Sequence, residues 1–218
     1  MMKKIFAVGI IALAGTACAV ETVSYDASIA LRQTNWSDSL VFPKFDPSLG
    51  ILKKVIFQID GHVEGNVQFE SLDAAGTTIT SFLQAEITLF RPDNTVLAVV
   101  IPVLMNSDPA TAFDGGTDFA GTSGKSYLGL SVDKSEMDMT SSLVDFALFT
   151  AALPGDTISL PVDAQGTSGG TGAGNLLLLT RTDAAARFIV TYEYNLIPTP
   201  SSLGLLGLAG LVVGRRRR

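Results

Sequence analysis

RFIVTYEYNL, residues 187–196, decides the fold class, because its side chains alternate in character over the whole stretch. In an extended chain one face carries large apolar side chains, namely Phe188, Val190, Tyr192, Tyr194 and Leu196. The opposite face carries mainly polar side chains, among them Arg187, Thr191, Glu193 and Asn195. A period of two over this length indicates a β-strand with one buried face, because a helix repeats every 3.6 residues.

Similar runs precede this stretch, at residues 22–32, 51–70, 79–90 and 95–104. The second run contains Gly61 and Gly65, so we expect it to form two strands joined by a turn in that region. The residues RPDN, which follow the third run, predict another turn. Short alternating runs separated by turn residues are typical of all-β proteins.

Two stretches are less regular. Residues 135–151, SEMDMTSSLVDFALFTA, are compatible with a short helix or with a turn and a strand. Residues 166–174, GTSGGTGAG, predict a surface loop or hairpin connection, and they do not match a phosphate-binding loop because no lysine follows. About nine to eleven strands with little helix predict an antiparallel β-sandwich of jelly-roll type.

The N-terminus has the layout of a secretory signal peptide. A basic start is followed by an apolar run, residues 5–14, and then by small residues. The run is shorter than the ~20 residues of a spanning helix. Ala17 and Ala19 fit the small-residue cleavage pattern, so we expect a signal peptide helix over residues 1–19 and cleavage after Ala19.

Cys18 is the only cysteine of the chain. It could serve as a lipid-attachment site, but Gly15 stands where bacterial lipidation favours a branched or large aliphatic residue. The sequence therefore favours cleavage over lipidation. Cleavage after Ala19 would remove the cysteine, and the fold would then contain no disulfide, although exported proteins are free to form them.

The C-terminal residues, 198–218, form a separate tail. Pro198, Thr199 and Pro200 break regular structure, residues 203–214 are uncharged and mostly apolar, and four arginines, Arg215, Arg216, Arg217 and Arg218, follow. A short apolar helix of this length measures about 18 Å, against ~30 Å for the hydrocarbon core. The tail thus predicts a transient membrane hold with the arginines on the cytoplasmic side. A core helix is the alternative, but four terminal arginines make a poor core.

Proline-x-proline, a short apolar helix and terminal arginines together resemble the PEP-CTERM sorting signal. That resemblance implies processing by a membrane transpeptidase of the exosortase type, in bacteria that make extracellular polysaccharide. Thr199 stands here where the signal usually has glutamate.

Residues 20–197 are long enough for one domain. All 21 acidic residues but only 9 of the 15 basic residues lie there, so the domain has a formal charge of −12. Such a domain repels nucleic acid and anionic lipid surfaces, and it suits an extracellular protein or one that binds cations.

Several motifs of this domain resemble the choice-of-anchor E domain. They are FPKFDPSLGILKKV at 42–55, FDGGTDFAGTSG at 113–124, LPVDAQG at 160–166 and VTYEY at 190–194. The resemblance implies an extracellular β domain with an interchangeable C-terminal anchor, and it brings no catalytic residues.

Candidate chemistry is sparse. Asp60, His62 and Glu64 would share one strand face, as a metal or acid–base group or as an ordinary solvated face. The second reading is favoured, because antiparallel sheets commonly have a polar outer face. Asp114 and Asp118 flank flexible glycines and could ligate calcium through their oxygens, although such residues are also ordinary in turns. Trp36, the only tryptophan, could stack on a sugar or, as its neighbours favour, pack in the core.

From these observations we expect an exported, non-enzymatic surface or matrix protein. Its partners would be signal peptidase, an exosortase-like transpeptidase and extracellular polysaccharide. A carbohydrate- or calcium-binding module is the alternative. A secreted hydrolase is a third reading, but Ser-His-Asp chemistry would have to rest on the single histidine, His62.

Overall fold

The computed structural model describes residues 20–197. The expected signal peptide helix, residues 1–19, and the expected sorting tail, residues 198–218, lie outside the described residues.

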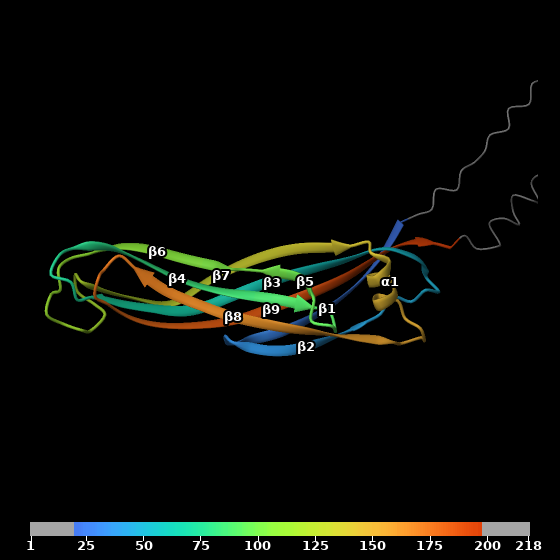
Figure 1. Ribbon diagram of the computed structural model, residues 1–218, viewed down its shortest axis with the longest axis horizontal. Helices are drawn as coiled ribbons and strands as arrows, with labels where there is room; N and C mark the ends of the chain where they lie inside the picture. The colour runs from blue at the N-terminus through green and yellow to red at the C-terminus, as the bar shows by residue number, and fades with distance from the viewer. Residues whose placement is uncertain (1–19, 198–218) are drawn as a thin grey trace, which may run out of the picture.

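Nine strands and one short helix make up the described part of the chain (Figure 1). In chain order they are β1 (Val20–Gln33), β2 (Trp36–Pro43), β3 (Gly50–Ser71), β4 (Thr77–Phe90), β5 (Val96–Val100), β6 (Val103–Ala110), β7 (Gly124–Thr140), α1 (Leu143–Phe149), β8 (Thr157–Thr171) and β9 (Leu176–Leu196). One sheet has the order β1-β9-β3-β7, and the other has the order β2-β8-β4-β5, with β6 also paired to β4.

The pairing makes the chain one long antiparallel hairpin that is folded over on itself. β1 pairs with β9, β2 with β8, β3 with β7, and β4 with β5 and β6. Folding adds two further antiparallel pairs, β3 with β9 and β4 with β8, which complete the two sheets. This is the arrangement of a jelly roll, and the expectation of an all-β antiparallel sandwich is confirmed.

The sandwich is elongated because β3 and β9 are unusually long strands. They contain 22 and 21 residues, and a strand rises about 3.3 Å per residue, which gives a length of roughly 70 Å. We call the end that contains Val20, Ile197 and α1 the near end, and the end that contains the 111–123 loop the far end (Figure 1).

The predicted turn near Gly61 and Gly65 is wrong, because both residues lie inside β3. A Cβ atom on Gly61 would approach Val100 Cγ1 to 2.8 Å, and one on Gly65 would approach the Arg181 carbonyl oxygen to 2.1 Å. The glycines therefore allow close contact between neighbouring parts of the sandwich, a role that glycine often has in a strand interior.

The core lies between the sheets and follows the predicted alternation of β9. Phe188, Val190 and Tyr192 are fully buried and Tyr194 is 8% exposed, whereas Leu196, at the strand end, is 43% exposed. The Tyr192 hydroxyl donates to the Pro43 carbonyl oxygen at 2.9 Å, so this deeply buried polar group is satisfied.

The two irregular stretches take defined forms. Residues 135–151 continue β7 to Thr140 and then form α1, whose first turn is capped by the Ser142 hydroxyl. The expectation of a loop at 166–174 is wrong for residues 166–171, because β8 continues to Thr171. The chain turns only after that point, at Gly172, where φ is +122° and glycine is favoured.

Candidate functional site

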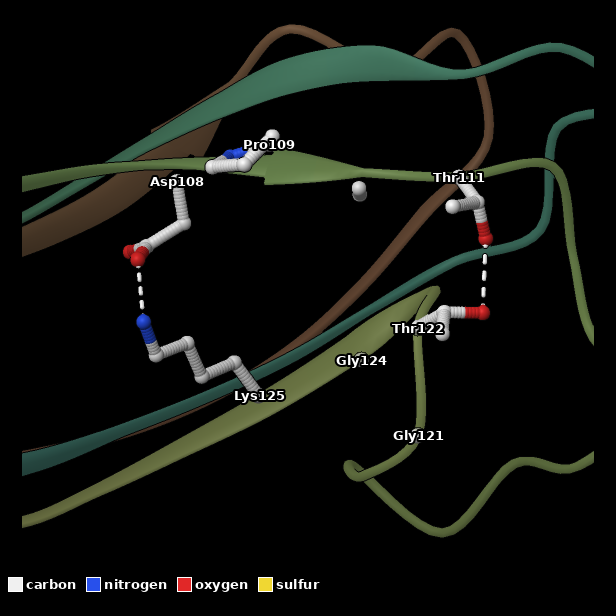
Figure 2. A pocket seen from close by; sticks show the side chains of 8 residues that line it. Asp108, Pro109, Thr111, Gly121, Thr122, Gly124 and Lys125 are labelled. Atoms are coloured by element: carbon white, nitrogen blue, oxygen red, sulfur yellow. Dashed lines mark hydrogen bonds and ion pairs between the residues drawn. The ribbon is translucent and has the colours of Figure 1, made fainter.

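A surface hollow at the far end gathers polar groups from two edge strands. It measures about 470 Å³ and is lined by residues of β6, β7 and the loop between them: Asp108, Pro109, Ala110, Thr111, Gly121, Thr122, Gly124 and Lys125. Figure 2 shows Asp108 and Lys125 pointing toward one another on one side, with the Thr111–Thr122 hydroxyl pair on the other. The two hydroxyl oxygens are 2.8 Å apart.

The Asp108 carboxylate links the two sheets at this edge. It lies on the inward face of β6, is 8% exposed, and accepts hydrogen bonds from Lys125 Nζ and from the Tyr127 hydroxyl, the latter at 2.6 Å. Burial raises the pKa of Asp108, but the bonds from Lys125 and Tyr127 outweigh it and hold the pKa below its usual value. The same ion pair raises the pKa of Lys125, so both groups stay charged and paired at neutral pH.

The 111–123 loop is organised by carboxylates, of which Glu70 is the most buried. Glu70 is completely buried at the end of β3 and accepts from Phe119 N at 2.9 Å and from Ser123 Oγ at 2.6 Å. Sequence reasoning missed it, because alternation along β3 places Glu70 on the outer face and gives no sign that Phe119 and Ser123, 49 and 53 residues later, cover it.

The structure places both predicted calcium ligands in this loop. Asp114 accepts from Gly116 N and Thr122 N, each at 3.1 Å, and Asp118 accepts from Ala120 N at 3.1 Å. These bonds lower the pKa of Asp114. In the described part of the chain no three His, Cys, Asp or Glu residues converge as a metal-binding group. Calcium binding by the pair stays a prediction.

His62 contacts only one of the two carboxylates that were predicted to share its strand face. His62 Nδ1 contacts Asp133 of β7 at 2.7 Å, and Nε2 contacts Glu64 at 2.9 Å. Asp60 instead accepts from Gln58 and from Ser135. Register explains the difference, because His62 lies opposite Asp133, 71 residues later in the chain.

Both imidazole nitrogens of His62 therefore face carboxylates, which only the protonated ring satisfies as a double donor. The hydrogen bonds with Glu64 and Asp133 raise the pKa of His62, although burial opposes them. A histidine whose two ring nitrogens are both engaged by carboxylates is poorly suited to act as a general base.

Trp36 lies in the core, as its neighbours indicated. The residue is 7% exposed, and the Arg32 guanidinium lies 4.6 Å from the ring centroid. A buried indole cannot offer a flat stacking surface to a sugar.

At the near end, Asp145 of α1 holds the helix against the sandwich. It is 3% exposed and accepts two hydrogen bonds from Arg91, at 2.7 and 2.9 Å, and one from Thr140 Oγ1 at 2.7 Å. The bonds from Arg91 lower the pKa of Asp145 more than burial raises it. A hollow of about 340 Å³ beside the pair is lined by Arg91, Pro92, Asp93, Val144, Asp145 and Leu148.

Within residues 20–197 the one helix, α1, is too short to cross a membrane.

Comparison with known proteins gives no family. No protein-family model matches the chain, and no curated protein matches it. Among solved structures, latent PorU from Porphyromonas gingivalis is 12% identical, with 79% of this chain and 13% of that chain covered and a TM-score of 0.23. The VP2 subviral particle of infectious bursal disease virus is 14% identical, with 98% and 54% covered and a TM-score of 0.19. This chain thus spans less than two thirds of either protein, and at these scores neither likeness bears on fold or function.

Proposed function

We propose that the protein is an exported, non-enzymatic surface protein that its C-terminal tail holds in the membrane until an exosortase-type system processes the tail. The observation that carries the proposal is the pairing of the two ends of the described chain. Val20 lies opposite Asn195 in the β1–β9 ladder. The expected signal peptide and the expected sorting tail therefore continue from the same end of the sandwich.

Attachment at one end suits a protein that displays the other end. The sandwich extends roughly 70 Å along β3 and β9, so a tail held in the membrane would set the far end about that distance from the bilayer. The far-end loop carries Asp114 and Asp118, and its negative charge would face away from anionic lipid.

Two side chains that could act as catalytic bases, His62 and Lys125, are both paired with carboxylates, which supports a role without catalysis. His62 is engaged by Asp133 and Glu64, and Lys125 is engaged by Asp108. Nucleophilic catalysis needs a base with a lone pair directed at the nucleophile. A screen of glycosidase and esterase substrates tests this part, and turnover that depends on His62 would contradict it.

The main test is the intact mass of the protein purified from the organism that encodes it. We expect a mass that starts at Val20 and lacks the residues after about Pro198. A Pro198→Ala, Pro200→Ala variant should retain the arginine tail, whereas Thr199→Glu, which restores the usual residue of the sorting signal, should be processed as before. A native mass that includes Arg215–Arg218 would contradict the exosortase step.

A second candidate function is a carbohydrate- or calcium-binding module, and the far-end hollow favours it. The hollow carries hydroxyls from Thr111 and Thr122, and Asp114 lies next to it in the same loop. Binding to a polysaccharide panel, with and without calcium, tests this candidate. Binding that requires calcium and is lost in Asp114→Asn would support it, and no binding under either condition would remove it.

A further inference from the structure

We propose that the near end of the sandwich rests on the lipid bilayer, with Leu143 and Val144 of α1 and Leu153 as the side chains that enter the interface. This inference rests on the proposed function and concerns the protein before exosortase processing, while the tail is still held in the membrane. It adds an orientation for the domain and a surface that makes the contact.

These three side chains are strongly exposed to solvent. Leu143 is 81% exposed, Val144 78% and Leu153 68%. Two adjacent aliphatic residues at the start of a helix, with a third just beyond its end, leave apolar surface in water at no gain to the fold. Three exposed aliphatic side chains at one end of the sandwich can form part of an interaction surface, which a single exposed residue such as Leu128 does not.

The other face of α1 is buried and holds the helix in place. Phe149 is fully buried, with its ring centroid 5.3 Å from that of Phe57. Asp145 is fixed by Arg91, and the Phe146 carbonyl oxygen accepts from Thr150 N. The outward direction of Leu143 and Val144 is therefore a fixed property of the fold.

The apolar tail segment follows the near end after a short stretch of chain. Ile197, which is 52% exposed, is the last described residue and belongs to the near end. Five residues, 198–202, separate it from the apolar segment 203–214. At no more than ~3.4 Å per residue they span about 17 Å, so a membrane-held segment keeps the near end close to the bilayer.

Charge does not drive the contact. The near end mixes Lys44 and Lys53 with Asp46 and Asp93, so anionic lipids gain little there. Apolar side chains inserted into the headgroup region need no anionic lipid. Contact should therefore occur on neutral phosphatidylcholine membranes.

The test uses residues 20–218, the chain expected after cleavage of the signal peptide, which contains no cysteine. It is reconstituted in phosphatidylcholine vesicles, and single introduced cysteines are labelled with an environment-sensitive fluorophore. Three sites are compared: Val144→Cys at the near end, Leu128→Cys as a matched control that is 71% exposed on β7, and Leu208→Cys in the tail. Nitroxide-labelled lipids then quench any label at the bilayer. We expect quenching at 144 and 208, and none at 128.

Each other outcome has a defined meaning. Quenching at 208 without quenching at 144 overturns the proposed orientation and leaves the membrane hold intact. No quenching at 208 removes the membrane hold, and the orientation falls with it. A blue-shifted but unquenched label at 144 would place a second copy or the tail itself on α1, which also overturns the proposal.

A charge variant provides an independent test. In a Leu143→Asp, Val144→Asp chain, a label at Leu153→Cys should lose its quenching, while thermal unfolding stays unchanged because both side chains are solvent-exposed. Leu128→Asp is the matched control and should leave quenching at 153 as it was. Quenching that persists in the double variant contradicts a contact made through α1.

Discussion

The near and far ends of the sandwich are closed by different physical means. At the near end α1 adds Phe149 to a group of rings that includes Phe45, Phe57 and Tyr192. At the far end the buried apolar cluster is small, with Phe69, Ile79 and Ala110. There the 111–123 loop is held instead by the Glu70 carboxylate. The near end is thus closed mainly by packing, with the Asp145–Arg91 pair beside it, and the far end is closed mainly by hydrogen bonds to carboxylates.

The difference implies different responses to perturbation. Packing of buried rings depends little on pH, whereas hydrogen bonds to carboxylates depend on their ionisation. We expect the near end to contribute most to global stability and the far end to open locally first.

The largest effect is expected from the near end. Phe149→Ala should lower the free energy of unfolding by about 3–5 kcal/mol, because it leaves a cavity beneath α1. Chemical denaturation measures the loss. Phe113→Ala, at a far-end residue that is 37% exposed, is the control and should cost well under half as much. Equal losses would contradict the contrast between the ends.

Removing the buried far-end carboxylate should have a smaller, more local effect. Glu70→Ala leaves Phe119 N and Ser123 Oγ without their acceptor, which costs about 1–3 kcal/mol. Hydrogen exchange should show faster exchange across 111–123 and unchanged exchange in α1. Asp118→Ala, which removes a single bond to Ala120 N in an exposed turn, is the matched control. Faster exchange at α1 would show that the ends are coupled.

Acid should weaken the far-end edge through Asp108. Its pKa lies below the usual 3.8 in the folded protein, so its contribution is present above the unfolded value and is lost as pH falls through the folded one. Wild type should thus lose melting temperature below about pH 4. Asp108→Asn should be less stable at pH 7 and closer to wild type at pH 2.5. A constant gap between the two proteins would contradict this role for the carboxylate.

The sequence predicted the features that depend on local alternation. The buried face of β9 follows from residues 188–194 alone, because a strand displays its side chains with a period of two. The turn predicted at the glycines of β3 was wrong. Gly61 and Gly65 leave room for Val100 and Arg181, which are remote in the chain. The local sequence pattern cannot distinguish a glycine in a turn from a strand glycine that lets another part of the chain approach closely.

The candidate site was harder to predict for the same reason. Apart from Glu64, the partners of Asp108, His62 and Glu70 lie 17 to 71 residues away. Sheet register brings Asp133 to His62, whereas the packing of the two sheets brings Lys125 to Asp108 and the 111–123 loop folds over Glu70. Asp114 and Asp118 were found because turn composition is local. Their loop, however, is organised by a glutamate from another strand.

The smallest expected effect concerns His62, which lies near the middle of β3, between the two ends. Because its pKa is raised in the folded protein above 6.5, its contribution is complete below that value and is lost as pH rises through the folded pKa. Asp133 is 84% exposed, so solvent screening limits the contribution to less than about 1 kcal/mol. His62→Gln should therefore lower stability at pH 5.5 and leave it unchanged at pH 9, as measured by denaturation at both values.

Ser135→Ala, on the same face, is the control and should lower stability equally at both pH values. A His62→Gln effect larger at pH 9 would mean that the neutral ring stabilises the face, and the pairing with two carboxylates would then not govern its ionisation.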